Sequence, residues 1–162
     1  MPISVESSDK AVRVLPWLIP ITYLLHIAEE LWGGEGYPAY VYRTRGVHLS
    51  TTRFLVAQFI GIALVSTGIM LARRFGFPST MLIILATTIM LNGFTHCFNA
   101  INSLSYNPGL VTSILIWIPM GIYAVVRLKR FVTYKRFVLA MAIGFGINLA
   151  IGVITLRGGK II

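Results

Sequence analysis

The segment VLPWLIPITYLLHIAEELW, Val14–Trp32, decides the fold of this chain. Its length and apolar character suit a transmembrane helix, since about 20 apolar residues cross the hydrocarbon core of a bilayer. It nevertheless contains His26, Glu29 and Glu30, in a chain that has five acidic residues in all. A charge at the bilayer centre costs about 2.5 to 3.5 kcal/mol on insertion scales. The two carboxylates must therefore be protonated, paired, hydrated, bound to a metal, or placed where the helix end reaches water.

The composition extends this interpretation to the whole chain. Of the 162 residues, 56% are hydrophobic and 12% are charged, whereas soluble domains carry about 25% charged residues. We therefore predict an all-α polytopic membrane protein, a five-transmembrane-helix bundle. The five windows that are long and apolar enough to span the membrane are Val14–Trp32, Phe54–Ala72, Pro78–Ile101, Pro108–Val126 and Phe137–Leu156.

Five spans predict a tail at 1–13, a single membrane domain at 14–156 and a short tail at 157–162. Basic residues are more numerous on the side that holds the N-terminus, so the positive-inside rule predicts a cytoplasmic N-terminus in a plasma (inner) membrane. Because these cations lie at span ends, where they meet lipid head groups, the net charge of +9 does not indicate nucleic-acid binding. The N-terminal side has Lys10, Arg13, Arg73, Arg74, Arg127, Lys129, Arg130, Lys135 and Arg136, and the other side has Arg43, Arg45, Arg53, Arg157 and Lys160.

Strongly polar residues of the predicted spans fall in one half of the membrane. The first and third spans run in the same direction, which places His26, Glu29 and Glu30 at about the depth of His96. Gln58 begins the second span at the same face of the membrane. A single buried site explains this common depth, whereas independent polar contacts would be scattered over both halves.

Helical spacing places these polar groups on shared faces. His26 lies three and four residues before the two glutamates, so all three can share one face. Asn92, His96 and Asn99 follow each other at i, i+4 and i+7, which makes one polar stripe. Lipid cannot satisfy such a stripe, so it should face the interior of the bundle. The alternative is a set of interhelical hydrogen bonds, each worth about 0.6 kcal/mol.

The loop Gly33–Arg53 contains its own structural signals. Glycines at 33, 34 and 36 followed by Tyr37-Pro38 predict a short interfacial helix. Its tyrosines suit the head-group region, and the helix could cover a site that opens at this face. His48, in the same loop, either joins the site or remains a solvated histidine.

The chain resembles the HXXEE-domain family of small membrane proteins over about residues 14–126. The resemblance implies membership and a set of candidate residues, and it does not imply a reaction. It rests on His26-x-x-Glu29-Glu30 in the first span, Asn92-x-x-x-His96 in the third, and Tyr106-Asn107-Pro108-Gly109, which opens the fourth.

Imidazole and carboxylate are ligands that zinc, iron and manganese accept. We expect His26, His96 and either Glu29 or Glu30 to bind a divalent metal such as zinc or iron. The other glutamate would then act as a general base on bound water. The residues expected to orient these ligands or contact the substrate are Asn92, Asn99 and Gln58.

These residues predict an integral membrane enzyme that acts on a hydrophobic or lipid-like substrate in the outer half of the membrane. A metal-free isomerase or hydrolase that uses a glutamate as acid and base is one alternative. A proton- or ion-coupled transporter and a non-enzymatic membrane subunit are two others, since intramembrane ionisable groups also occur in those classes. The expected partners are the lipid bilayer and a hydrophobic small molecule, and a homo-oligomer is a further possibility.

Overall fold

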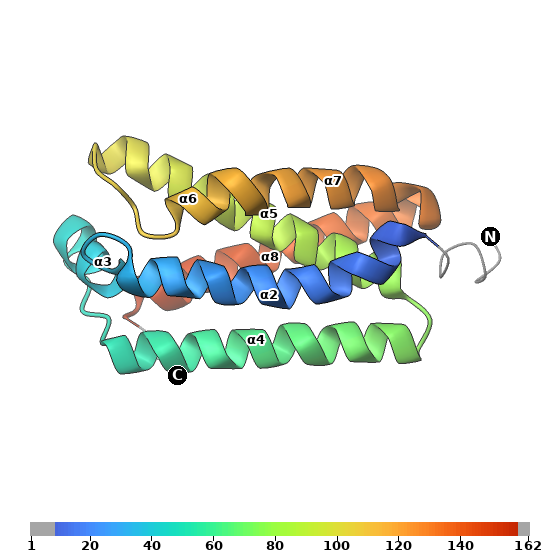
Figure 1. Cartoon of the computed structure of the whole chain (residues 1–162), viewed down its shortest axis with the longest axis horizontal. Coiled ribbons are helices and arrows are strands. Elements are labelled where there is room, and N and C mark those ends of the chain that lie inside the picture. The colour runs from blue at the N-terminus through green and yellow to red at the C-terminus, as the bar shows by residue number, and fades with distance from the viewer. Residues whose placement is uncertain (1–8, 159–162) are drawn as a thin grey trace.

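The computed structural model describes residues 9–158, and all regular elements in this part of the chain are helices (Figure 1). Five of them, with Leu110–Phe131 taken as one, are long and apolar enough to cross a membrane. The predicted all-α bundle of five transmembrane helices is therefore confirmed. In chain order the elements are α2 (Lys10–Trp32), α3 (Tyr37–Arg45), α4 (Thr51–Arg74), α5 (Pro78–Ser103), α6 (Leu110–Thr112), the π-helical turn η1 (Ser113–Trp117), α7 (Ile118–Leu128), the 3-10 turn η2 (Lys129–Phe131) and α8 (Tyr134–Leu156).

Polar caps extend three helices beyond their apolar windows. The Asp9 carboxylate accepts a hydrogen bond from Ala11 N at 2.9 Å, so α2 begins before the predicted window. Ser50 and Thr133 cap α4 and α8 in the same way, through their side-chain oxygens. Such caps satisfy backbone N–H groups that the helix itself leaves unpaired. Each of these helices therefore begins at a polar residue outside its apolar window.

The first long helix begins before the predicted boundary of the membrane domain, whereas the last one ends at Leu156, as the prediction has it. Residues 10–13, assigned to the N-terminal tail, form the first turn of α2. Residues 1–8 of that tail lie outside the described residues, as do residues 159–162 of the predicted C-terminal tail, including Lys160.

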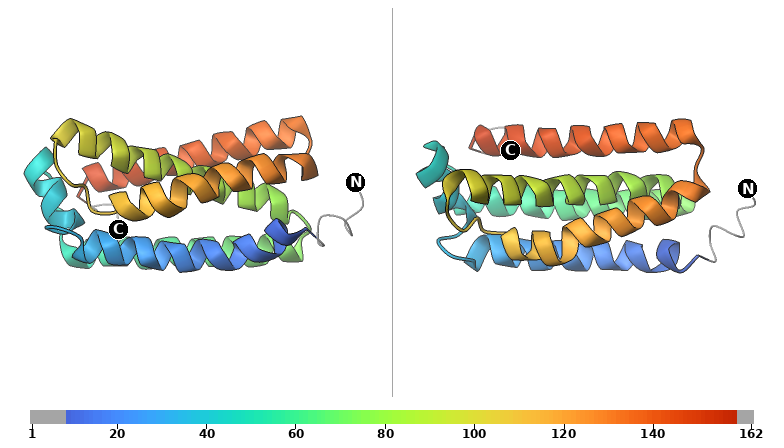
Figure 2. Two further views of the ribbon diagram at one scale, coloured as in Figure 1. Left: turned by 45° about the horizontal axis from the view of Figure 1, so that its top comes forward. Right: turned by 90° about the horizontal axis from the view of Figure 1, so that it is seen from above.

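Helix α5 is the centre of the bundle and packs against α2, α4, α7 and α8 (Figure 2). Half of its apolar window is buried, against 11% for α4 and for α8. Gly121 and Gly144 allow α7 and α8 to approach it closely, because a Cβ at either position would lie under 3 Å from an α5 carbonyl oxygen.

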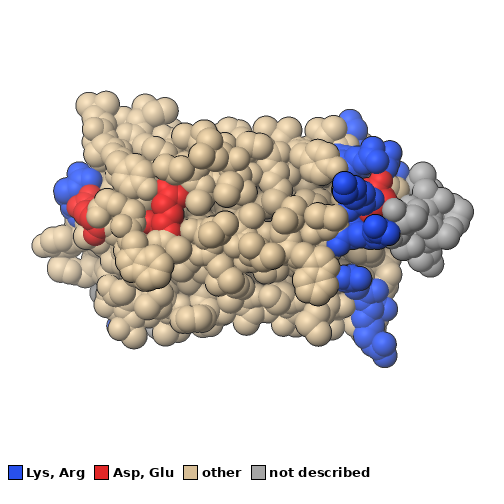
Figure 3. Space-filling view, viewed as in Figure 1, with Lys and Arg blue, Asp and Glu red and all other residues tan. Residues whose placement is uncertain are grey.

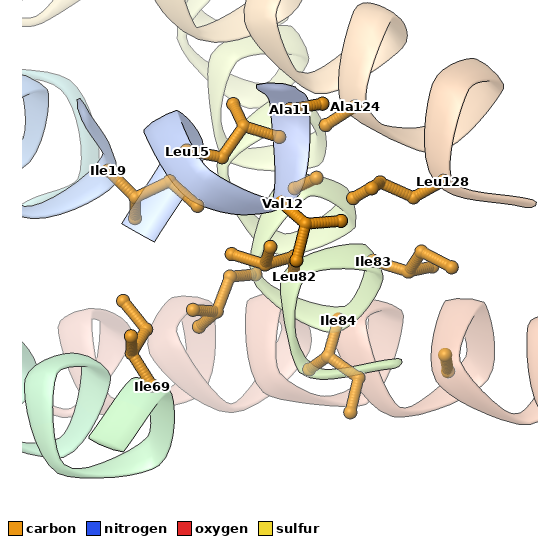
Figure 4. Packing of buried hydrophobic residues seen from close by; sticks show 13 residues of the cluster. Ala11, Val12, Leu15, Ile19, Ile69, Leu82, Ile83, Ile84, Ala124 and Leu128 are labelled. Atoms are coloured by element: carbon orange, nitrogen blue, oxygen red, sulfur yellow. The ribbon is translucent and has the colours of Figure 1, made fainter. Parts of the chain in front are cut away.

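Apolar and polar packing occupy opposite ends of the bundle. The buried apolar cluster draws on α2, α4, α5, α7 and α8, near the end of the bundle where α2 begins (Figure 4). The opposite half contains the buried side chains of His26, Glu30 and His96, and α3 lies at that end of the bundle (Figure 1). The cluster consists of Ala11, Val12, Leu15, Ile19, Ile69, Leu82, Ile83, Ile84, Leu85, Ala86, Ala124, Leu128 and Ala140.

Lys and Arg gather at the end of the bundle where α2 begins (Figure 3). The buried Asp9 pairs there with Arg127, at 3.0 Å, and with Arg130. Burial by itself would raise the pKa of Asp9, but the hydrogen bond from Ala11 and the two arginines outweigh it and hold the pKa below its ordinary value. Five apolar helices whose cations lie at their ends identify an integral membrane protein.

Candidate metal centre

Helices α2 and α5 bring two imidazoles and one carboxylate together. His26 and Glu30 lie one turn apart on the same face of α2, and His96 of α5 faces them. The Oε1 atom of Glu30 lies 3.8 Å from Nε2 of His26 and 3.5 Å from Nε2 of His96. The three side chains are buried, at 2%, 5% and 3% exposure for His26, Glu30 and His96. Their potential ligand atoms all lie within 4.8 Å of one another, so the group could hold a metal ion.

The partner of His96 determines where its ring carries a proton. Nδ1 of His96 lies 2.7 Å from Oδ1 of Asn107, and an amide oxygen can only accept a hydrogen bond. With the Asn107 amide in this orientation, Nδ1 is assigned the proton. In this assignment Nε2 of the neutral ring presents a lone pair toward Glu30.

The same reasoning applies to His26. Its Nδ1 lies 2.7 Å from the Thr112 hydroxyl, which lies 2.5 Å from Oε2 of Glu29 and 3.3 Å from the carbonyl oxygen of Gly109. Both of those oxygens are acceptors, and the shorter contact, to the charged carboxylate of Glu29, assigns the single hydroxyl proton of Thr112 to that residue. His26 must then donate from Nδ1, and its Nε2 also presents a lone pair toward Glu30.

Three electron-rich atoms thus face one another in a buried space. Within residues 9–158, Nε2 of His26 has no hydrogen-bond partner. An unsatisfied buried polar atom costs about 1 to 3 kcal/mol, so this arrangement requires a proton or a cation. In a tetrahedral zinc site with bonds of about 2.0 to 2.2 Å, neighbouring ligand atoms lie about 3.4 Å apart. The two distances to Glu30, 3.5 and 3.8 Å, are close to that value, and all pairs of candidate ligand atoms lie within 4.8 Å.

A hydrogen-bond chain fixes the orientation of Glu30. Gln58 of α4 donates from Nε2 to Oε2 of Glu30 at 2.8 Å. The hydroxyl of Tyr23 donates to Oε1 of the same glutamine at 2.8 Å. Tyr23 reaches α4 because residue 61 is glycine, since a Cβ there would collide with the phenol oxygen. One oxygen of Glu30 is therefore occupied and the other remains directed at the two histidines.

The segment before α6 packs directly against both imidazoles. Gly109 has a φ of 95°, in the left-handed region that favours glycine. A Cβ on Gly109 would lie 2.7 Å from Cε1 of His96 and 2.8 Å from Cε1 of His26. Trp117, at the end of the π-helical turn, stacks on His26 with ring centroids 3.7 Å apart. π-helical turns inside α-helices occur frequently at functional sites.

Some predicted site residues lie outside this group. Glu29 contacts the first turn of α6, where it accepts hydrogen bonds from Tyr106, Val111 and Thr112. Asn99 belongs to the contact between α5 and α3, because its Oδ1 accepts from Arg45 at 2.7 Å.

Asn92 lies one turn before His96 on α5, and its buried Oδ1 has no partner within the described residues. His48 packs on the Tyr42 ring, with centroids 4.3 Å apart, apart from the buried group.

Four residues that contact the two histidines could not be assigned to the site from the sequence. Asn107 and Gly109 belong to the motif Tyr106-Asn107-Pro108-Gly109, but nothing in the sequence indicates that they contact the histidines. Thr112 and Trp117 carry no signal of their own, because threonine and tryptophan are common in membrane helices. Only the placement of the fourth span against the first reveals their contacts with His26.

A family described as "Protein of unknown function with HXXEE motif" matches residues 17–124. That range contains His26, Glu29, Glu30 and His96, together with Asn107, Gly109 and Thr112. No curated protein and no solved structure gives a significant match to the chain. Because the match covers well over half of the sequence, and with it the whole buried group, the chain belongs to the HXXEE family.

Proposed function

We propose that His26, His96 and Glu30 hold a divalent transition metal, zinc or iron, and that the chain is a membrane-embedded enzyme acting on a lipid-like substrate. The observation that carries the proposal is the set of three mutually facing lone pairs, two of them on imidazoles whose protons are fixed elsewhere. Imidazole nitrogen and carboxylate oxygen suit both metals. A cation would also remove much of the cost of holding a carboxylate in the membrane.

The number of ligands favours catalysis over a purely structural role. Structural zinc sites are closed by four protein ligands, whereas catalytic sites use three and leave a position open. Here the described chain supplies three. When bound, a divalent ion of this kind acts as a Lewis acid and lowers the pKa of a bound water.

Glu29 and Glu30 have different contacts, and this difference changes the role expected for each of them. Glu30 faces both histidines and is the proposed ligand, while Glu29 accepts hydrogen bonds on both of its oxygens. Glu29 is therefore not a free general base in this arrangement. We assign the chemistry to the metal and its ligands, and no separate glutamate base is needed.

Two unpaired polar atoms beside the histidines could bind a polar group of the substrate. Trp117 is 4% exposed, and its Nε1–H has no acceptor within residues 9–158. Oδ1 of Asn92 likewise has no donor. Together they offer one buried donor and one buried acceptor on residues near the two histidines in the fold, which suits an amphiphile whose polar group enters the membrane.

Access to the buried group requires motion, and α3 is the candidate element. The Tyr37 ring lies 5.8 Å from that of His96, and the Tyr40 hydroxyl donates to the carbonyl oxygen of Asn99 at 3.1 Å. Glycines with positive φ, Gly36 and Gly46, lie at the two ends of α3. We propose that α3 moves to admit a substrate from the outer interface, with the N-terminus of the chain in the cytoplasm.

Metal content tests the proposal directly. Protein purified in detergent without chelator should contain about one zinc or iron per chain by elemental analysis. His96→Ala and Glu30→Gln should lose the metal, whereas His48→Ala should keep it, because His48 lies outside the group. A folded wild type without metal would refute this function. If Glu30→Gln nevertheless abolished a cellular lipid change, metal-free acid–base chemistry would replace it.

The lipid substrate can be sought with the same variants. Lipid extracts of cells that express the wild type or Glu30→Gln should differ in at least one species by mass spectrometry. His48→Ala cells should match the wild type. If all three extracts agree while the wild type carries metal, the enzymatic part of the proposal fails and a structural metal site remains.

A further inference from the structure

The two adjacent glutamates of the HXXEE motif have different surroundings. Glu30 is 5% exposed and faces the histidines, whereas Glu29 points toward the start of the fourth span. The carboxylate of Glu29 accepts four hydrogen bonds, from Tyr106 Oη at 2.6 Å, Val111 N at 2.8 Å, Thr112 N at 2.7 Å and Thr112 Oγ1 at 2.5 Å. A carboxylate with four donors has no lone pair left for a metal.

Glu29 supplies the cap that the fourth span lacks. The helical segment Leu110–Phe131 begins after Gly109, which has no side chain to cap it. The first N–H groups of a helix need acceptors, and a carboxylate there also interacts favourably with the helix dipole. Glu29 fills this role from another helix by accepting from Val111 N and Thr112 N. It thereby fixes the first turn of the fourth span against α2.

That first turn and the residues just before it contact the two imidazoles. Thr112 accepts from Nδ1 of His26, Asn107 accepts from Nδ1 of His96, and Gly109 packs between the two rings. Because Thr112 donates its only hydroxyl proton to an acceptor such as Glu29, it can only accept from His26. A continuous path therefore runs from Glu29 through Thr112 to His26.

We propose that Glu29 is a positioning residue that acts through Thr112. It keeps the proton of His26 on Nδ1 and directs Nε2 toward the metal, while Glu30 is the ligand. This inference rests on the proposed metal-binding function, but the state of the His26 ring can be measured without metal. Outer partners of metal-bound histidines typically change metal affinity by about 10- to 100-fold. The motif therefore needs two consecutive glutamates because one binds the ion and the other orients the histidine that binds it.

The experiment compares four variants with the wild type in detergent. Nitrogen-15 NMR of labelled histidine reports the protonated ring nitrogen in metal-free protein, and titration with Co²⁺ followed by its visible spectrum reports affinity. Thr112→Val removes the hydroxyl at nearly constant volume, and Thr112→Ser restores it. Glu29→Gln keeps the shape of the carboxylate but removes its charge. Tyr106→Phe is the matched control, since it deletes one donor to Glu29 and leaves Thr112 in place.

We expect His26 and His96 of the wild type to be protonated on Nδ1. Thr112→Val and Glu29→Gln should move part of the His26 proton to Nε2 and weaken Co²⁺ binding by about 10- to 100-fold. Thr112→Ser and Tyr106→Phe should stay within about twofold of the wild type, by the same reasoning. A folded Thr112→Val protein with unchanged ring state and affinity would overturn the proposal. If the wild type binds no Co²⁺ while Thr112→Val still shifts the His26 proton, the metal function fails and the control of His26 by Thr112 stands.

Discussion

Replacing Gly109 with alanine is the most direct structural test of the site. The new Cβ would lie 2.7 Å from Cε1 of His96, and relief to 3.4 Å requires a shift of about 0.7 Å. Metal constellations must be held within about 0.5 Å of their working geometry, so the shift should displace at least one ligand. The positive φ costs an alanine roughly 1 to 2 kcal/mol, and overpacking adds roughly 1 to 3 kcal/mol. We expect Gly109→Ala to lose about 2 to 5 kcal/mol of stability and at least tenfold in metal affinity.

Two other glycines provide matched controls for this prediction. Gly46 and Gly76 also have positive φ, 65° and 78°, but a Cβ at either one meets nothing within 4 Å. Gly46→Ala and Gly76→Ala should therefore show only the backbone cost, about 1 to 2 kcal/mol, with unchanged metal affinity. Thermal unfolding in detergent and Co²⁺ titration measure the two effects. The reasoning is refuted if Gly109→Ala binds Co²⁺ as tightly as the two controls.

Three further predictions concern the ends of the bundle. Asp9→Asn keeps the cap but loses the charge, so unfolding at pH 7 should require about 1 kcal/mol less. Because the pKa of Asp9 lies below its ordinary value of 3.8, this difference should persist at neutral pH and disappear as the pH falls through the lowered pKa, which melting curves at pH 7 and pH 3 can check. Tyr40→Phe loses the hydrogen bonds that connect α3 to Asn99 and Ser103, so a chelator should remove the metal several-fold faster than from the wild type. An unchanged rate of metal removal would argue against entry by way of α3. Single cysteines at positions 10 and 157, in a Cys97→Ala background, should be labelled from opposite sides of the membrane, and labelling from one side would contradict the five-span topology.

The sequence was sufficient for the architecture because membrane helices have a strong one-dimensional signal. Each apolar window appears as a helix, and the glycines before Tyr37 predict α3 correctly. The helix ends differ from the windows because caps such as Asp9 are polar and so fall outside any apolar window. Hydropathy finds the part of a helix that lies in lipid, whereas hydrogen bonding determines where the helix begins.

The sequence was sufficient to locate the site but not to assign a role to each of its residues. Common depth and helical spacing selected His26, Glu30 and His96, which the structure brings within 4.8 Å of one another. The same spacing placed Glu29 equally near His26, since i+3 and i+4 neighbours both adjoin residue i. Which carboxylate faces the histidines depends on how α2 is rotated against α5 and on where the fourth span starts. Neither quantity is encoded in the periodicity of a single helix, so the two glutamates could not be told apart.

The position of the fourth span explains how one of the two carboxylates is accommodated inside the membrane. A carboxylate in lipid must have its charge matched or its oxygens hydrogen-bonded. Glu29 meets this requirement with the first turn of that span, so its partners come from the fold alone. Glu30 has one donor, Gln58, and two imidazole nitrogens that present lone pairs to its other oxygen. The fold therefore completes the surroundings of Glu29 and leaves those of Glu30 open, and a bound proton or cation would complete them.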